Sequence, residues 1–457
     1  MTFFRSRPHP IHIGIVLTFL LIPVWYRLPR SPFLSDLYVT RFLLLLPVVW
    51  TIGTWLLTGV PGLRDFLRDQ RRVRWGLCLL LLALLAFSSQ SWAFIRERYP
   101  EVAATSALQF GVVVLFALVV ACAKPSPRAI IAALAVGVLW NALLTFAQTA
   151  NQGALGLSSF GEFNMNIDTI GASVVVAGDL RWLRPYGLLP HPNILGGFFV
   201  IGLLALVGWM TSPDRRLRWL GTLLFLVGLW ALLLTFSRAA WLGLAAGAFA
   251  LYPLLRPHLK PVWRHILISG ALIVIVGIAF VIIYRPLLSA RAGEGAESVE
   301  LRSISDRTVY TYYALEAVNE NPLLGVGIGN FPWRASYYLS LTDYDLRGQP
   351  VHQVFLSAWS ELGVIGYALT ALTLMLGVEA ALKAIRQGMS AAVPETVHNS
   401  TRQAALLCAV IALMLVGLLD HYPWTLLQFQ AAWWGLLAAA AFPGNDNAAP
   451  ATRNGAV

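Results

Sequence analysis

Four short stretches of the sequence place arginine, histidine or carboxylate side chains beside long apolar runs. They are TFSRAAW (235–241), RPYGLLPHPNILGG (184–197), SISDRT (303–308) and VHQVFLSAWSELG (351–363). A guanidinium group binds phosphate oxygens through two parallel hydrogen bonds, and a neutral imidazole can remove a proton from a hydroxyl group. These residue types therefore predict an anion site beside a general base.

Arg238 is the only charged residue in a run of about 37 residues, 219–255. A single helix of that length would extend about 55 Å, nearly twice the thickness of a hydrocarbon core. The run is therefore predicted to form two spans that reverse at TFSR, with Arg238 at the tip. An arginine in that position is either a snorkelling side chain at a helix end or part of an anion site.

The second stretch gathers four side chains that form hydrogen bonds, Arg184, Tyr186, His191 and Asn193, within ten residues. Pro192 suits the first turn of a helix, so His191 and Asn193 are predicted at its mouth. The alternative is a helix that begins at a proline and has incidental polar neighbours.

The third stretch is predicted to begin a helix that Ser305 or Asp306 caps and that Asn321-Pro322 ends. Arg307 in the first turn would oppose the helix dipole. It is therefore expected to pair with Asp306 or another acid, or to bind an anionic ligand.

In the fourth stretch, His352 begins a predicted span and is either a polar cap or a general base. Glu361 follows nine residues later, roughly 13 Å deeper along a straight helix, where a carboxylate needs a partner or a proton. Asp420, His421 and Tyr422 are predicted to form a further polar cluster at a turn between the last two spans.

Two other motifs carry less weight. GVGIG (325–329) resembles a nucleotide loop, but no strand precedes it. Asp343 and Asp345 could hold a metal, although a three-residue match is weak. Since the three cysteines all lie in apolar runs without pairing, neither a disulfide nor a cysteine metal site is expected. We predict no metal and no cofactor.

The composition predicts an all-α polytopic membrane protein, because 58% of residues are hydrophobic and only 12% are charged, about half the charged share of soluble proteins. Residues 1–457 are predicted to form one integral membrane domain with about twelve spans. The segments are 11–26, 38–59, 75–95, 102–123, 128–150, 191–211, 217–236, 239–255, 265–284, 353–382, 403–420 and 424–442.

Two predicted loops are too long to be turns. Residues 151–190 contain a short hairpin at SVVVAGDLRW, and residues 285–351, between the ninth and tenth spans, contain short helices after a mobile beginning, SARAGEGAESVELRS. With the N-terminus inside, 19 of the 33 lysines and arginines fall on the cytoplasmic side, and short outer loops hold 8. Both termini are therefore predicted to be cytoplasmic and both long loops extracytoplasmic. The net charge of +11 is attributed to inner loops that face anionic membrane lipids, and needs no nucleic acid.

Taken together, these motifs resemble the O-antigen ligase and polymerase family of bacterial membrane proteins. The resemblance is carried by RPYGLLPHPN, TFSRAAW, and NPLLGVGIGNF followed by VHQVFLSAWSELGVIG, and it extends from about residue 130 to residue 440. It implies a metal-independent glycosyltransferase at the outer face of the cytoplasmic membrane. The implied donor is a glycan on undecaprenyl diphosphate, and the implied acceptor is a hydroxyl of a glycan, lipid or protein.

The resemblance also implies roles for individual residues. His352 matches the histidine that acts as general base, and Arg238 and Arg307 match arginines that hold the diphosphate; Arg184 is a further diphosphate candidate. The supporting residues are expected to be His191, Asn193, Tyr186, Gln353, Glu361, Asp420 and Tyr422.

One departure concerns the residue after the histidine, which is often Asn in the ligases and is Gln353 here. Ligase, polymerase and protein-glycosylating activities therefore stay open. The alternative from another class is a flippase or transporter of lipid-linked saccharides. It is less favoured because the polar groups gather at the predicted outer rim instead of along a central path.

Overall fold

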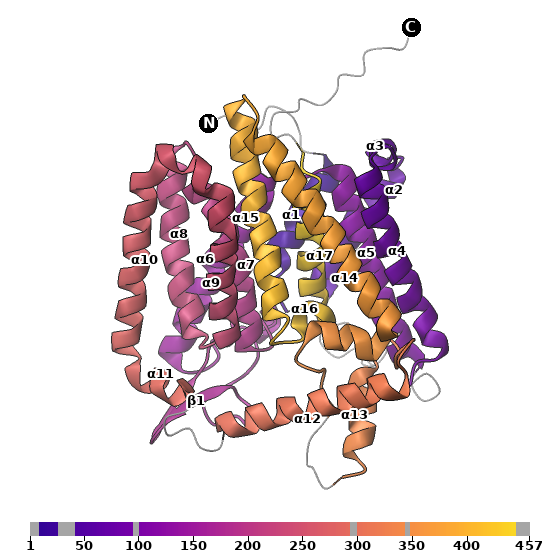
Figure 1. Cartoon of the computed structure of the whole chain (residues 1–457). Helices are drawn as coiled ribbons and strands as arrows, with labels where there is room; N and C mark the ends of the chain where they lie inside the picture. The colour runs from indigo at the N-terminus through magenta and orange to yellow at the C-terminus, as the bar shows by residue number, and fades with distance from the viewer. Residues whose placement is uncertain (1–8, 26–41, 95–99, 293–298, 343–347, 445–457) are drawn as a thin grey trace.

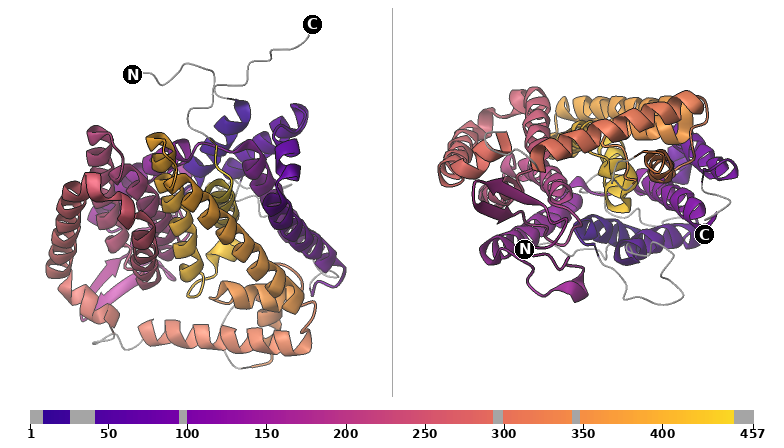
Figure 2. Two further views of the ribbon diagram at one scale, coloured as in Figure 1. Left: turned by 45° about the horizontal axis from the view of Figure 1, so that its top comes forward. Right: turned by 90° about the horizontal axis from the view of Figure 1, so that it is seen from below.

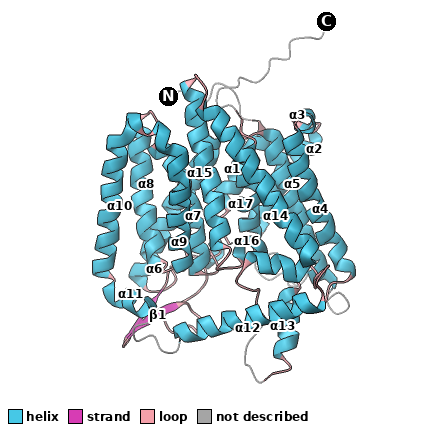
Figure 3. Cartoon of the chain, in the orientation of Figure 1, coloured by secondary structure: helices cyan, strands magenta, loops and turns pink. Residues whose placement is uncertain are grey.

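The computed structural model describes residues 9–25, 42–94, 100–292, 299–342 and 348–444 (Figure 1). Within these residues the chain is helical apart from loops and one two-stranded hairpin (Figure 3). The elements up to the hairpin are α1 (Pro10–Leu21), α2 (Phe42–Leu57), α3 (Leu63–Arg68), α4 (Gln70–Ser88), η1 (Ser89–Ser91), α5 (Pro100–Ala123), α6 (Pro127–Asn151), η2 (Ser158–Phe160), β1 (Val174–Ala177) and β2 (Leu180–Leu183).

The remaining elements carry the site and the second half of the bundle. They are α7 (Pro192–Met210), α8 (Arg215–Leu234), α9 (Arg238–Leu255), η3 (Arg256–His258), η4 (Lys260–Val262), α10 (Trp263–Ile283), α11 (Arg285–Ala292), α12 (Val299–Glu320), α13 (Phe331–Leu339), α14 (Val354–Met389), α15 (Pro394–Val416), α16 (Tyr422–Thr425) and α17 (Leu427–Ala441).

Within the described residues, each predicted span overlaps a helix, and the chain is an all-α polytopic membrane protein. In the part of the chain that the structure describes, nine helices are long and apolar enough to cross a membrane. The other three, α1, α2 and α17, are shorter than 18 residues. The number of twelve crossings therefore stays a prediction.

Burial orders the helices from the centre of the bundle outward. In the most apolar 18-residue stretch of each helix, 89% of the residues of α7 and 83% of those of α15 are buried, against 11% for α10. Such a helix with few protein neighbours exposes an apolar surface that suits lipid. The hairpin, α11, α12 and α13 cover the lower end of the bundle in Figure 1, and α12 runs across that end when it is viewed from below (Figure 2).

The long segment before α14 differs from the predicted one at its start. Residues 285–292, part of which was expected to be mobile, form helix α11. Helix α12 begins at Val299, so Ser305 and Asp306 lie inside it and neither is its cap. The predicted stop is observed, since α12 ends at Glu320, directly before Asn321-Pro322. The cap prediction was wrong because Ser305 and Asp306, although good caps, are also tolerated within a helix.

A kink at Gly363 divides α14 into two parts. Gly363 has φ 67° and ψ −173°, and the part before it lies across the lower end of the bundle before the helix turns along the bundle (Figure 1). The expected depth of Glu361 assumed that this first part of α14 runs along the bundle, whereas it lies across the end of the bundle (Figure 1). Figure 1 places the kink near the level of α16.

The GVGIG loop satisfies the backbone groups that the kink releases. The N–H groups of Val326 and Gly327 donate to the carbonyls of Ser360 and Glu361, both at 2.9 Å, and the Val364 N–H donates to Pro322 O at 2.9 Å. Buried backbone groups require such partners, especially in a membrane protein. The loop is thus a structural partner of the kink.

We predict that Gly363→Ala destabilises the folded protein. An added Cβ would lie 2.0 Å from Leu323 O, and the positive φ disfavours any side chain. The thermal midpoint in detergent should fall by several degrees. The matched control is Gly270→Ala in α10, where no atom lies within 4 Å of the added Cβ. Equal midpoints for the Gly363 variant and the wild type would contradict this account.

Candidate functional site

A polar pocket of about 350 Å³ opens between the hairpin, the α8–α9 turn and the helices that cover the lower end of the bundle. Six of the predicted site residues line it: Arg184, His191, Asn193, Arg238, Arg307 and His352. These residues come from segments up to 168 positions apart. We call this cavity the arginine pocket.

Arg238 lies at the turn that its sequence context predicted. Helix α8 ends at Leu234, Phe236 adopts a φ of 48°, and Ser237 caps α9, in which Arg238 is the first residue. The Arg238 Nη1 donates to the backbone carbonyl of Arg291 at 2.9 Å. Arg291 Nη2 in turn donates to Phe236 O at 3.1 Å. Helix α11 thereby brings a further arginine to the pocket.

Arg307 projects into the same pocket from α12, and Asp306 also lines it. Among the residues that the structure describes, no carboxylate lies within ion-pairing distance of Arg307. The pairing that the sequence suggested for this arginine is therefore not observed. Its charge is left facing the cavity with Arg238 and Arg291.

Arg184 is buried and engaged by the protein itself. Its Nε donates to Thr235 O at 2.6 Å, its Nη1 to Ser173 Oγ at 2.7 Å and its Nη2 to Asn193 Oδ1 at 2.6 Å. These bonds join the first long loop to the α8–α9 turn and to the beginning of α7. The geometry favours a positioning role over direct ligand binding.

The backbone around Tyr186 is fixed by a buried side chain of α6. The N–H groups of Tyr186 and Gly187 both donate to Gln148 Oε1, at 3.0 and 2.8 Å. Gln148 Nε2 donates to the carboxylate of the buried Glu162 at 2.8 Å. The Tyr186 hydroxyl accepts from the Ser173 N–H at 2.8 Å. Tyr186 thus supports the wall of the pocket through Ser173, which lines it.

His191 and Pro192 begin α7 as the sequence predicted. Pro192 is its first residue, and His191 Nδ1 accepts from the Asn193 N–H at 3.1 Å. The accepting nitrogen must be unprotonated, so this bond requires one tautomer of a neutral ring.

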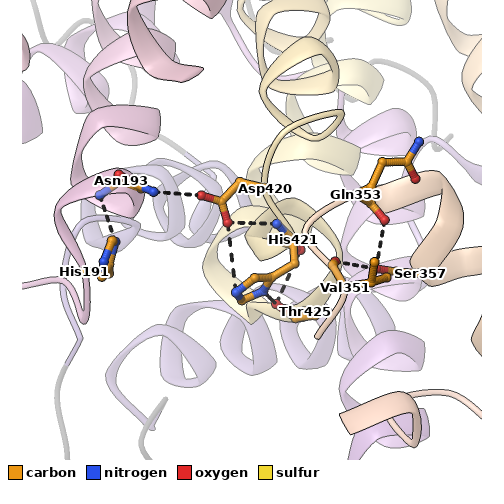
Figure 4. Close-up of polar contacts among 8 residues, drawn as sticks. All are labelled: His191, Asn193, Val351, Gln353, Ser357, Asp420, His421 and Thr425. Atoms are coloured by element: carbon orange, nitrogen blue, oxygen red, sulfur yellow. Dashed lines mark hydrogen bonds and ion pairs between the residues drawn. The ribbon is translucent and has the colours of Figure 1, made fainter. Parts of the chain in front are cut away.

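A chain of polar contacts connects Arg184 to the histidines, and Figure 4 shows its part from His191 and Asn193 to Asp420 and His421. Asn193 accepts from Arg184 and donates through Nδ2 to Asp420 Oδ2 at 3.1 Å, and the His421 N–H donates to Asp420 Oδ1 at 2.9 Å. The rings of His352 and His421 lie edge to face with centroids 5.1 Å apart. Asp420 is thereby held against two imidazoles.

His352 is neutral at physiological pH. Its pKa is lowered to about 4, mainly by burial, while Asp420 acts in the opposite direction and His421 and Arg307 contribute to the decrease. Within the described residues, its buried Nδ1 has no hydrogen-bond partner. Gln353 caps α14, with Oε1 accepting from the Leu356 N–H. A neutral imidazole fixed just before a capped helix can serve as a base.

A second cavity of about 430 Å³ is lined by His421, whose ring packs against that of His352. His421, Glu361 and Trp424 line it together with Trp333, Gln109 and Gln430. Glu361 accepts from Trp424 Nε1 at 2.8 Å, which supplies the partner that the sequence required for a buried carboxylate. Tyr422 lines neither cavity and packs beside Gly197, where a Cβ would lie 2.0 Å from its hydroxyl.

The pattern of ligand atoms allows one metal site in the described part of the chain. His352, Asp420 and His421 each offer an atom, and these atoms lie within 4.8 Å of one another. The positive charges of the neighbouring arginines disfavour the binding of a metal cation there. Asp343 and Asp345 fall outside the described residues, and the expectation that no metal is needed stays a prediction.

Sequence reasoning missed two residues of the arginine pocket, Arg291 and Gln349. His421, which was predicted only as part of a polar cluster with Asp420 and Tyr422, lines the second cavity. The helix that carries Arg291 could have been found from the pattern RPLLSARA, in which Arg-Pro begins a helix and Leu287 and Ala290 share a buried face, but its place in the pocket could not. No local signal brings Gln349 to the pocket.

Comparison with known proteins yields one family match. Residues 222–371 match the family model described as O-Antigen ligase. The matched segment contains Arg238, Arg291, Arg307, His352 and Glu361. No curated protein sequence matches the chain. Over these residues the chain is similar to the O-antigen ligase family, and together with the apolar helices this match supports its assignment as a multi-pass membrane protein of the O-antigen ligase and polymerase family.

Proposed function

We propose that the protein transfers a glycan from undecaprenyl diphosphate to an acceptor hydroxyl at the outer face of the bacterial cytoplasmic membrane. The observation that carries the proposal is one pocket in which Arg238, Arg291 and Arg307 face a neutral His352. This combination suits a reaction with an anionic leaving group and a hydroxyl nucleophile.

The proposed orientation places both termini in the cytoplasm and the arginine pocket outside, with twelve crossings. The distribution of lysine and arginine in the short loops supports it.

The donor diphosphate would occupy the arginine pocket. A diphosphate gains negative charge as it leaves, and prearranged guanidinium groups stabilise that charge without a metal. Arg184 would act through position, since its donors hold Asn193 and the α8–α9 turn. The pocket lies where a lipid tail could extend along the bundle while the diphosphate stays at its end.

The acceptor would enter from the second cavity. No lysine or arginine lines that cavity among the described residues, and its lining combines Trp333 with a hydrogen-bonded pair, Gln109 and Gln430, at 2.7 Å. Indole faces and planar amides suit the C–H faces and hydroxyl groups of a sugar ring. An uncharged sugar hydroxyl fits this lining better than an anionic group.

In the proposed step, the acceptor hydroxyl attacks the anomeric carbon of the donor glycan. His352 takes the hydroxyl proton, the new C–O bond forms, and the bond to the diphosphate breaks with its electron pair leaving on the phosphate oxygen. Asp420 stabilises the imidazolium that results. With the diphosphate in the arginine pocket and the acceptor in the second cavity, attack would be in line at the anomeric carbon and would invert it.

We predict that His352→Ala lowers glycan transfer by about 10²–10⁴-fold, because proton removal by a placed base contributes that much. The assay supplies undecaprenyl-diphosphate-linked oligosaccharide and a saccharide acceptor to the protein in nanodiscs, and mass spectrometry follows released undecaprenyl diphosphate. The control is His258→Ala, in η3 near the opposite end of the bundle. Near-normal transfer by a folded His352→Ala protein would refute the role, and lipid movement without bond cleavage by the wild type would favour a transporter.

The rate should depend on pH through the protonation of His352. Since burial lowers its pKa to about 4, the neutral base is present above that pH and is lost as pH falls through it. kcat/KM should therefore be level from pH 6 to pH 8, with a decline only below about pH 5. A decline centred near pH 6.5 would indicate an unperturbed histidine.

Arg307→Ala and Arg184→Ala should separate ligand binding from positioning. Removing Arg307 should lower kcat/KM by about 10²–10³-fold with an unchanged thermal midpoint, as for loss of one transition-state donor. Removing Arg184 leaves three acceptors without a donor, so the Arg184→Ala variant should lose ~2 kcal/mol or more of unfolding free energy. Its thermal midpoint should fall accordingly. If Arg184→Ala changed only KM, its assignment as a positioning residue would be wrong.

A further inference from the structure

A second charged pocket lies at the end of the bundle opposite the arginine pocket. It has a volume of about 630 Å³ and lies between α3, the beginning of α4 and the second part of α14 (Figure 1). Its lining is Asp65, Arg68, Asp69, Gln70, Arg71, Arg72, Arg74, Lys124, Leu376, Glu379, Ala380 and Lys383. The reaction proposed above uses none of these residues.

Half of the cations of this pocket are neutralised by carboxylates. Lys124 pairs with Asp65 at 3.0 Å, Arg72 with Asp69 at 3.2 Å, and Lys383 with Glu379. Arg68, Arg71 and Arg74 have no carboxylate within 4.0 Å among the described residues. The pocket therefore keeps an excess of three positive charges.

Arg72 has a buried hydrogen-bond donor that is not satisfied within the described residues. Its guanidinium packs on the Phe442 ring, 5.2 Å from the ring centroid, which fixes its position. In the described structure its buried Nη1 has no hydrogen-bond partner. A buried donor without a partner is unfavourable, and phosphate oxygens are the acceptors that guanidinium groups bind best.

An apolar surface continues from the arginines along α4. Helical spacing places Arg74, Leu77, Leu81 and Leu84 on one face, and the three leucines are exposed at 54%, 42% and 62%. Exposed leucines on a spanning helix are a surface for lipid chains. A ligand that matches both parts carries a phosphate at one end and hydrocarbon at the other.

We propose that this pocket binds the phosphate of an anionic phospholipid, with the acyl chains against the leucine face of α4. The phosphate would accept from Arg71, Arg72 and Arg74, and the net negative charge of the lipid would balance the excess of the pocket. A free phosphate ion shares the headgroup chemistry but cannot use the leucine face. The proposal stands independently of the transferase assignment.

The test measures the thermal midpoint of the purified full-length protein in detergent as lipid is added. Phosphatidylglycerol should raise the midpoint, whereas phosphatidylcholine and inorganic phosphate at equal concentration should not. The double variant Arg71→Ala/Arg74→Ala should bind phosphatidylglycerol about 30-fold more weakly, as expected when two basic contacts of about 1 kcal/mol each are lost. Glycan transfer in nanodiscs gives an independent readout of the proposed function and should be retained by the variant.

Arg215→Ala/Arg216→Ala is the matched control, because both residues are exposed arginines that begin α8 at the same end of the bundle. It should keep the full response to phosphatidylglycerol. If Arg71→Ala/Arg74→Ala fails to fold, Arg71→Gln alone is measured and should weaken the response. An unchanged response in a folded variant, an equal loss in the control, or an equal shift with inorganic phosphate would overturn the proposal.

Discussion

The hydrogen-bond chain Arg184–Asn193–Asp420 is the contact on which the candidate site depends. It joins the first long loop, the beginning of α7 and the turn after α15, while Arg184 also holds the α8–α9 turn that carries Arg238. Each link pairs a charge with a polar side chain or carbonyl at a buried position, where an unpaired group would be costly. The chain therefore fixes the pocket without using the arginines that face it.

The separation between a buried, hydrogen-bonded arginine and arginines that face the pocket reduces the cost of placing several positive charges together. Several guanidinium groups around one small cavity repel each other, and a buried arginine without partners would destabilise the fold. The structure buries Arg184 with three acceptors and leaves Arg238 exposed at a helix beginning. Asp420 supplies the nearby negative charge and lies beside the histidines. The pocket thus keeps a positive charge, while the buried arginine behind it is satisfied by hydrogen bonds.

Local rules predicted the parts of the site that depend on neighbouring residues. Pro192 at the beginning of α7 and the end of α12 before Pro322 follow from residue preferences, and the length of its apolar run placed Arg238 at a turn. The predicted cap of α12 was wrong, because a good cap residue can also lie inside a helix. The predicted depth of Glu361 did not take the course of α14 into account, because a glycine kink has no distinct sequence pattern. The approach of Arg291 to Arg238 is a tertiary contact between α9 and α11, which local pattern does not encode.

The kink also explains why two distant motifs occur together. NPLLGVGIGNF and ELGVIG look unrelated in the sequence, yet Gly325 has a φ of 67° and a Cβ there would lie 2.6 Å from Glu361 O, while Gly363 approaches Leu323 as closely. Each glycine makes room for the backbone of the other segment. The kink sets the direction of the part of α14 that follows His352. Substitutions in the GVGIG loop can therefore shift the position of His352 without contacting it.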